Sequence, residues 1–236
     1  MQWREEILAE GVRLINGDCL EVLPTLGRFD AVVTDPPYGI GESSKKAATR
    51  GKLAAAKDYG GQEDWDKVPA DPRVIEWVRA NSDTQVIFGG NYFDLPPTSC
   101  WLVWDKQNGD NDFADCELAW TNMPKAVRRI NWMWNGMLRK GKEDRVHLTQ
   151  KPLGVMEWTL GHLPRSVRSV CDPYMGSGTT GVACVKRGLN FVGIEKAANN
   201  FDIARGRIEA ALREPSLLVE PPKPAQQLTF DTGEAA

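Results

Sequence analysis

Three acidic residues stand directly at the ends of apolar, β-branched runs of the kind that form buried strands. Asp35, Asp172 and Glu195 occupy these positions. Runs of this kind are typical of parallel strands buried on both faces, and such sheets bind ligands beyond the carboxyl ends of their strands. The pattern therefore predicts that three carboxylates meet at one edge of a parallel sheet.

The residues after the first of these runs have the types needed to activate an aromatic amine. They are Asp35, Pro36, Pro37 and Tyr38. The amino nitrogen of adenine is a weak nucleophile because its lone pair is delocalised into the ring. The Asp35 carboxylate and the Pro36 carbonyl could each accept one N–H and free that lone pair, since two prolines hold this backbone rigid. Tyr38 could stack on a base rotated out of the duplex, and in-line attack on a methyl group would then need no covalent enzyme intermediate.

A glycine-rich turn follows the second acidic residue and predicts a cofactor site. Its residues are Asp172, Pro173, Gly176, Ser177, Gly178 and Thr179. The turn lacks the lysine of a phosphate-binding loop, which argues against nucleotide triphosphate hydrolysis. An acid ahead of the glycines opposes a pyrophosphate and suits a cationic ligand such as S-adenosylmethionine, which carries an ammonium and a sulfonium. Glu195 stands about where an acid grips ribose hydroxyls in related folds.

The elements that must position these residues alternate in the manner of an α/β domain. The order of strand, glycine-rich turn, helix and strand predicts a βαβ unit with a parallel sheet. We expect one methyltransferase domain at residues 1–213, with target-recognition elements inserted within 39–145, and a disordered tail at 214–236. Strands are expected at 11–16, 29–34, 85–88, 101–104, 117–121, 167–171 and 190–194, a strand or ribbon at 126–134, and helices at 72–80, 153–163, from the turn to about 186, and 197–212.

Composition places the chain among ordinary globular proteins. Its 236 residues are 42% hydrophobic and 26% charged, as is usual for a soluble domain. No run is apolar enough to span a membrane and the first residues lack a signal-peptide pattern, so a cytoplasmic protein without membrane contact is expected. The five cysteines are widely spaced, form no cluster with histidine that would bind a metal, and are interpreted as reduced thiols.

The basic residues are concentrated in two segments, although the net charge of the chain is −3. Residues 43–57 carry five basic side chains and no acidic one, and residues 124–151 carry eight against two. This asymmetry suits a protein that holds the phosphates of double-stranded DNA, but two solvated basic loops would give the same pattern. Most of the seven tryptophans in 39–145 are expected in the core. The candidate DNA-binding residues are Lys45, Lys46, Arg128, Arg129, Arg139 and Lys140.

The order of these motifs resembles the β class of DNA amino-methyltransferases, which place Asp-Pro-Pro-Tyr before the cofactor loop. Further similarities are NGDCL at 16–20, HLTQKP at 147–152, CDPYMGSGTT at 171–180 and GIE at 193–195. Leu148 replaces the usual proline of the second motif, and Tyr174 replaces the usual phenylalanine of the third. The resemblance implies a Rossmann-like fold with a mostly parallel, seven-stranded sheet flanked by helices.

The resemblance also implies roles residue by residue. The Asp35 motif would be catalytic, the turn from Asp172 and Glu195 would contact S-adenosylmethionine, and Asp18, Cys19 and Lys151 would lie beside it. Adenine N6 is the favoured target, because cytosine-N4 enzymes more often carry Ser-Pro-Pro-Tyr. Protein glutamine methylation, with Asn-Pro-Pro-Tyr, fits less well. A non-catalytic nucleic-acid-binding module would be expected to have a broken cofactor loop, which this sequence does not have.

The last segment offers a hypothesis about partners. Gln226, Gln227, Leu228, Thr229 and Phe230 resemble the short peptides that bind the bacterial sliding clamp, although this copy is a residue shorter than usual. An inert tail is the favoured interpretation, since Pro and polar residues surround these two apolar side chains. The sequence leaves a homodimer open.

Overall fold

The computed structural model describes residues 3–40, 66–108, 114–134 and 150–214. Several candidates from the sequence lie outside these residues and stay predictions. They are Lys45 and Lys46, Arg139 and Lys140, and the segment at 226–230.

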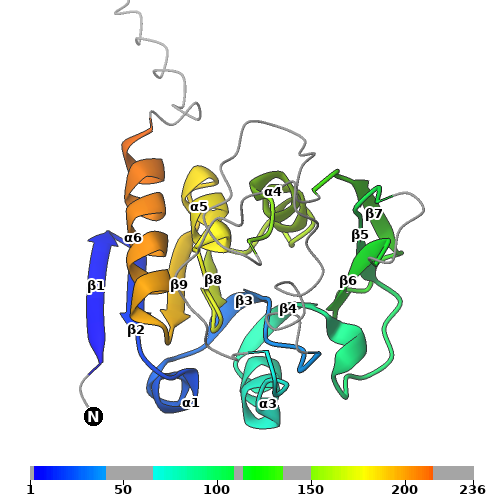
Figure 1. Ribbon diagram of the computed structural model, residues 1–236, viewed down its shortest axis with the longest axis horizontal. Coiled ribbons are helices and arrows are strands. Elements are labelled where there is room, and N and C mark those ends of the chain that lie inside the picture. The colour runs from blue at the N-terminus through cyan, green and yellow to red at the C-terminus, as the bar shows by residue number, and fades with distance from the viewer. Residues whose placement is uncertain (1–2, 41–65, 109–113, 135–149, 215–236) are drawn as a thin grey trace, which may run out of the picture.

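The described residues form one nine-stranded sheet in the order β1-β2-β9-β8-β3-β4-β6-β5-β7 (Figure 1). Every strand expected from the sequence is present, with ends shifted by a few residues. The strands are β1 (Arg4–Ala9), β2 (Val12–Asn16), β3 (Phe29–Thr34), β4 (Ser82–Phe88), β5 (Trp101–Asp105), β6 (Cys116–Thr121), β7 (Arg128–Asn131), β8 (Ser169–Asp172) and β9 (Asn190–Glu195).

The sheet is mostly parallel, as expected, but it is wider than seven strands. Only β1 and β6 run against the other seven, because each pairs antiparallel with its neighbours. The strand that the sequence analysis missed is β1, an edge strand with the sequence REEILA and no buried residue. It lacks an apolar run because only β2 covers it, so hydrophobic patterning gave no signal there.

Helices cover both faces of the sheet, giving three layers. On one face lie α1 (Cys19–Val22) and α3 (Pro72–Ala80); on the other lie α4 (Leu153–Gly161), α5 (Thr179–Lys186) and α6 (Ala198–Arg213), as Figure 1 shows. Asp71 caps α3 by accepting a hydrogen bond from the backbone N–H of Arg73. Gly188, with φ +67°, follows the end of α5, a position at which glycine is favoured.

Each strand between these layers is buried on both faces. Ala31 and Val33 of β3 face the core under α4–α6, and Val32 faces the core above α1 and α3, as the alternation of side chains along a strand requires. The expected burial of tryptophans is confirmed for the six described between 66 and 134, each of which is buried or packs against a core. All five cysteines are free thiols. Among the described helices, none is both long enough and apolar enough to cross a bilayer.

Candidate functional site

Four acidic side chains predicted from the sequence gather at the carboxyl ends of β2, β3, β8 and β9. The Thr34 hydroxyl donates to Asp172 Oδ1 at 2.8 Å, which ties the end of β3 to the end of β8. On the other side, the side-chain amide of Asn16 donates to the carbonyl of Glu195 at 2.8 Å and ties β2 to β9. The sheet thus forms one continuous acidic edge, where ligands bind in open parallel sheets.

The segment after β3 is fixed by residues that follow in the chain. Buried Asp66 accepts hydrogen bonds from the backbone N–H groups of Tyr38 (2.9 Å) and Gly39 (3.0 Å). The carbonyl of Pro37 accepts from the N–H of Ala70 at 2.9 Å. Pro36 is buried, and no described residue donates a backbone hydrogen bond to its carbonyl. The backbone is therefore rigid and leaves one carbonyl as an acceptor.

Tyr38 contacts Asp35 and a second tyrosine. Its hydroxyl donates a short hydrogen bond to Asp35 Oδ1. Its ring stacks on that of Tyr92, with centroids 5.0 Å apart and planes 15° apart. Gly89 lies against the same ring, where a Cβ would meet ring carbons at 2.0 Å. Tyr92 is 49% exposed, so the stacked pair has an outer member at the surface. Stacking of a base on Tyr38 stays a prediction.

Lys151 lies beside Asp35 and not in the glycine-rich turn. Its Nζ donates to Asp35 Oδ2 at 2.6 Å and lies 2.8 Å from Glu117 Oε2. Glu117 in turn pairs with Lys106, with 2.6 Å between Nζ and Oε1. The sequence placed Lys151 near the cofactor; the structure makes it the counter-ion of the proposed catalytic carboxylate.

The charges in this cluster shift one another's ionisation. Burial raises the pKa of Asp35, although Lys151 opposes that shift. Burial also disfavours ionised Glu117, but Lys151 and Lys106 together lower its pKa to about 2. The pKa of Lys151 is raised, because its two carboxylates outweigh its burial. At neutral pH the cluster therefore holds an ammonium between two carboxylates.

The turn after β8 is shaped by glycine and held by an arginine. Gly176 has φ +54°, and a Cβ there would point into open space. Gly178 has φ +80°, and its Cβ would lie 2.8 Å from the Cβ of Ala204 in α6. Arg207 of α6 donates to the carbonyl of Ser177 at 2.6 Å and also contacts the hydroxyls of Ser177 and Thr179. The turn therefore keeps its backbone close to α6 and leaves space beside Gly176.

The two carboxylates that flank this turn are oriented by hydrogen bonds. Burial raises the pKa of Asp172 to about 6, although hydroxyl and backbone donors oppose the shift. Glu195 accepts from the backbone N–H of Gly176 at 2.9 Å and of Ala197 at 2.8 Å. A carboxylate has about four lone-pair positions, so Glu195 keeps acceptor capacity for hydroxyl groups of a ligand.

Asp18 and Cys19 lie next to this group, as the sequence predicted. Asp18 caps α1 by accepting from the N–H of Leu20 at 2.9 Å and pairs with Lys196 at 2.9 Å. Cys19 is buried, and burial raises the pKa of its thiol. Cys19 therefore contributes a neutral group to the wall of the site.

The two described DNA-binding candidates lie away from this edge, on β7. Arg128 and Arg129 are exposed, and Arg129 is 3.8 Å from Asp105, a distance typical of a weak surface ion pair. Their charges are accessible to a ligand in solution.

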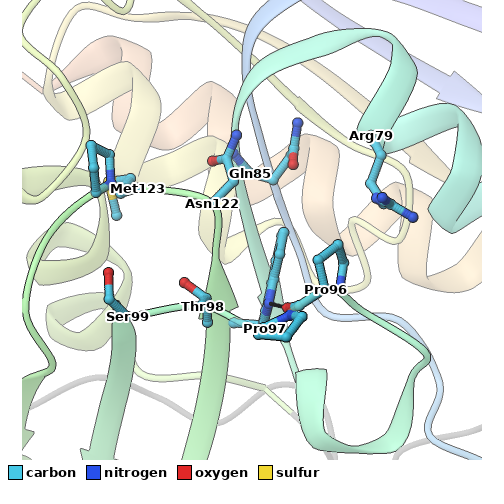
Figure 2. Close-up of a pocket in the computed structure, with 10 residues that line it drawn as sticks. Arg79, Gln85, Pro96, Pro97, Thr98, Ser99, Asn122 and Met123 are labelled. Atoms are coloured by element: carbon cyan, nitrogen blue, oxygen red, sulfur yellow. Dashed lines mark hydrogen bonds between the residues drawn. The ribbon is translucent and has the colours of Figure 1, made fainter.

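A separate hollow of about 460 Å³ lies where α3 leads into β4, away from Asp35 (Figure 2). The polar groups at its rim are already satisfied: Gln85 donates to Ser82, and Asn122 bonds the backbone of Gln85 and Asp83. This hollow is therefore not the site that the motifs predict.

Sequence reasoning missed several residues that the fold brings to the site. Glu117 offered one signal, since it is a charged residue inside the apolar strand CELAWT. Tyr92 stands in a glycine-rich turn after a strand, which resembles many connecting loops. The others carry no local signal, because their roles depend on packing between distant segments. The missed residues are Asp66, Tyr92, Lys106, Glu117 and Arg207.

Comparisons with known proteins agree with this geometry. Residues 103–206 match the family described as DNA methylase, N6_N4_Mtase. The chain is 25% identical over 267 residues to the type II methyltransferase M.HinfI of Haemophilus influenzae, covering 89% of this chain and 73% of that protein. It is 26% identical over 250 residues to the type II methyltransferase M.ScaI of Streptomyces caespitosus, covering 84% and 82% of the two chains.

Solved structures share the fold. The M1.HpyAVI–SAM complex aligns with a TM-score of 0.52 at 22% identity, over 83% of this chain and 98% of that one. The Thermus thermophilus protein TTHA0409, a DNA modification methylase in complex with S-adenosyl-L-methionine, aligns with a TM-score of 0.54 at 17% identity, over 86% and 95% of the chains. At these identities the likeness concerns the fold.

Proposed function

The chain belongs to the DNA amino-methyltransferase family, and on that premise we propose that it methylates the exocyclic N6 of adenine in double-stranded DNA. The observation that carries the proposal is the junction of two halves at one sheet edge. Thr34, next to Asp35, donates to Asp172, the first residue of the glycine-rich turn. An amine-activating group and a cofactor turn therefore lie within reach of one another.

The residues around the turn fit S-adenosylmethionine. The open space at Gly176 admits a ligand close to the backbone, and the carboxylates of Asp172 and Glu195 suit its ammonium group and its ribose hydroxyls. When bound, this cofactor supplies a methyl group on a positively charged sulfur. The acidic edge favours that positive charge, whereas it would oppose the phosphates of a dinucleotide.

The chain's own groups would prepare the amine. Asp35 and the Pro36 carbonyl accept the two N–H groups of the target, which frees the nitrogen lone pair. Each oxygen of Asp35 already accepts one hydrogen bond, from Tyr38 or from Lys151, and each retains a further lone pair. These bonds hold the carboxylate in one orientation before the substrate arrives, so little reorganisation is needed at the reacting centre.

Adenine is favoured over cytosine because Asp35 begins the catalytic motif. The exposed arginines of β7, Arg128 and Arg129, are proposed to contact phosphates together with Lys45, Lys46, Arg139 and Lys140. By analogy with the type II enzymes that it resembles, the chain would act as the modification enzyme of a restriction–modification pair.

Incubation with methyl-labelled S-adenosylmethionine and unmethylated DNA, followed by nucleoside analysis, tests the proposal. The expected product is N6-methyladenine, whereas N4-methylcytosine would show the alternative target. Asp35→Ala should lower transfer by roughly 100-fold or more, the typical loss when an oriented partner at a reacting centre is removed. Equilibrium dialysis should show cofactor affinity within a few-fold of the unaltered chain. Cofactor and DNA binding without any transfer would indicate a non-catalytic binding module.

A further inference from the structure

Four charged side chains from separate segments form a continuous series of ion pairs that ends at Asp35. We call Lys106, Glu117, Lys151 and Asp35 the charge ladder. Successive nitrogen–oxygen distances along it are 2.6, 2.8 and 2.6 Å. Lys106 follows β5, Glu117 lies in β6 and Lys151 precedes α4. The ladder therefore links the strands of the middle region to the proposed catalytic carboxylate.

Aromatic rings keep the two lysines in place. Lys151 Nζ lies 4.8 Å from the ring centroid of Phe88, and Lys106 Nζ lies 5.1 Å from that of Trp104. The side chain of Lys151 is 9% exposed and that of Lys106 is 20% exposed. A cation held over a ring in a largely buried position has little freedom to turn to solvent. The distances in the ladder are thus set by packing.

The ladder divides one ammonium between two carboxylates. If Lys151 contacted Asp35 alone, it would neutralise that carboxylate and make it a weaker acceptor for an amine N–H. Glu117 draws the ammonium the other way. Lys106 reduces the pull of Glu117, because it provides that carboxylate with a positive charge of its own.

We propose that Glu117 and Lys106 are positioning residues that set how strongly Lys151 holds Asp35, and thereby how strongly Asp35 accepts a hydrogen bond from the target amine. The inference rests on the proposed function and extends it to two residues outside every motif of the sequence. Neither residue would touch the base or the cofactor.

The other groups that face Asp35 do not belong to the ladder. Tyr38 donates to Asp35 from its own segment, and Asp172 acts on it electrostatically from β8. Both stay in place when Glu117 or Lys106 is replaced. Changes in the behaviour of Asp35 in such variants therefore report on the ladder.

Two charge-removing variants of the full chain, Glu117→Gln and Lys106→Met, test the proposal because they act in opposite directions. Single-turnover rates are measured with labelled S-adenosylmethionine and unmethylated DNA between pH 5.5 and 8.5. Glu117→Gln removes a negative charge near Asp35 and leaves Lys151 to Asp35 alone. The acid limb of the pH profile should move to lower pH, and the plateau rate should fall by about 10-fold, less than for loss of a direct partner.

Lys106→Met should move the acid limb to higher pH, because an unshared Glu117 draws Lys151 away from Asp35. The ratio of the rate at pH 6 to the rate at pH 8 should thus rise in one variant and fall in the other. Cofactor affinity should stay within two-fold in both, since the ladder does not include the glycine-rich turn. Lys106→Arg should restore the unaltered profile.

Matched substitutions in ion pairs outside the site provide the controls. Glu209→Gln in α6 and Lys186→Met in α5 remove the same charges from surface pairs and should leave the profile unchanged. If Glu117→Gln fails to fold, the upward shift in Lys106→Met and its reversal in Lys106→Arg decide the question. Acid limbs that stay in place, or that move in the same direction, would overturn the proposal. Absence of transfer by the unaltered chain would refute the proposed function itself, and the ladder's role would fall with it.

Discussion

Replacing Lys151 by methionine should destabilise the fold, because two carboxylates lose their shared counter-ion. Methionine keeps most of the packing against Phe88 and removes only the charge. Removing one partner of a buried pair costs about 3–5 kcal/mol. The side chains of Asp35 and Glu117 are 29% and 22% exposed, so solvent screens part of this effect and about 2–3 kcal/mol is expected.

This loss should appear as a fall in Tm of about 5–10 °C, since 1 kcal/mol corresponds to roughly 2–4 °C in a domain of this size. The raised pKa of Lys151 means that its contribution is complete at pH 7, well below the ordinary pKa of a lysine. The lowered pKa of Glu117, about 2, makes its stabilising contribution decline only as the pH falls below its ordinary range. Asp35 has a raised pKa and takes up a proton earlier on acidification. The deficit of the variant should therefore shrink between pH 7 and pH 5.

Urea and thermal unfolding of the unaltered chain, Lys151→Met and the surface control Lys186→Met, each at pH 7 and pH 5, measure this effect. The control should lie within about 0.5 kcal/mol of the unaltered chain, because its pair is exposed. A Tm change of Lys151→Met no larger than that of the control, or a deficit that grows on acidification, would show that the buried pairs do not act as described.

Three further results are expected. Gly178→Ala should lose about 1–3 kcal/mol of unfolding free energy in urea, because φ is +80° and the added methyl would contact α6; an unchanged midpoint would mean that the turn can relax. Arg207→Met should weaken S-adenosylmethionine binding by roughly 10-fold in calorimetry, as expected when charge-assisted bonds that shape a turn are lost; equal loss of affinity for DNA would point instead to general misfolding. Replacing Arg139 and Lys140 with Ala should weaken DNA binding and flatten its dependence on salt, and an unchanged slope in a salt titration would place the binding face elsewhere. Truncation after Arg213 should leave turnover on short duplexes intact, because every proposed site residue precedes the cut; a large drop would show that the tail completes the site.

The sequence by itself determined the parts of the site that depend on local structure. Asp35 and its prolines, and the turn from Asp172, follow directly on buried strands, and the apolar runs that precede them identify those strands without further information. The parallel arrangement followed from the same runs, since the carboxyl ends of parallel strands share one edge. Local chemistry and local periodicity were therefore enough for the fold class and for both motifs.

Only the tertiary structure decided which charges meet. Lys151 lies in a motif next to the cofactor half, yet packing over Phe88 brings it to Asp35, 116 positions earlier. Glu117 and Lys106 reach the same place because β6 begins where β5 ends, at the carboxyl end of β4. Such contacts depend on how segments distant in the chain pack together, and neither propensity nor spacing encodes that distance. For this reason, the sequence identified the groups that act on the substrate, whereas the fold revealed the groups that hold them in place.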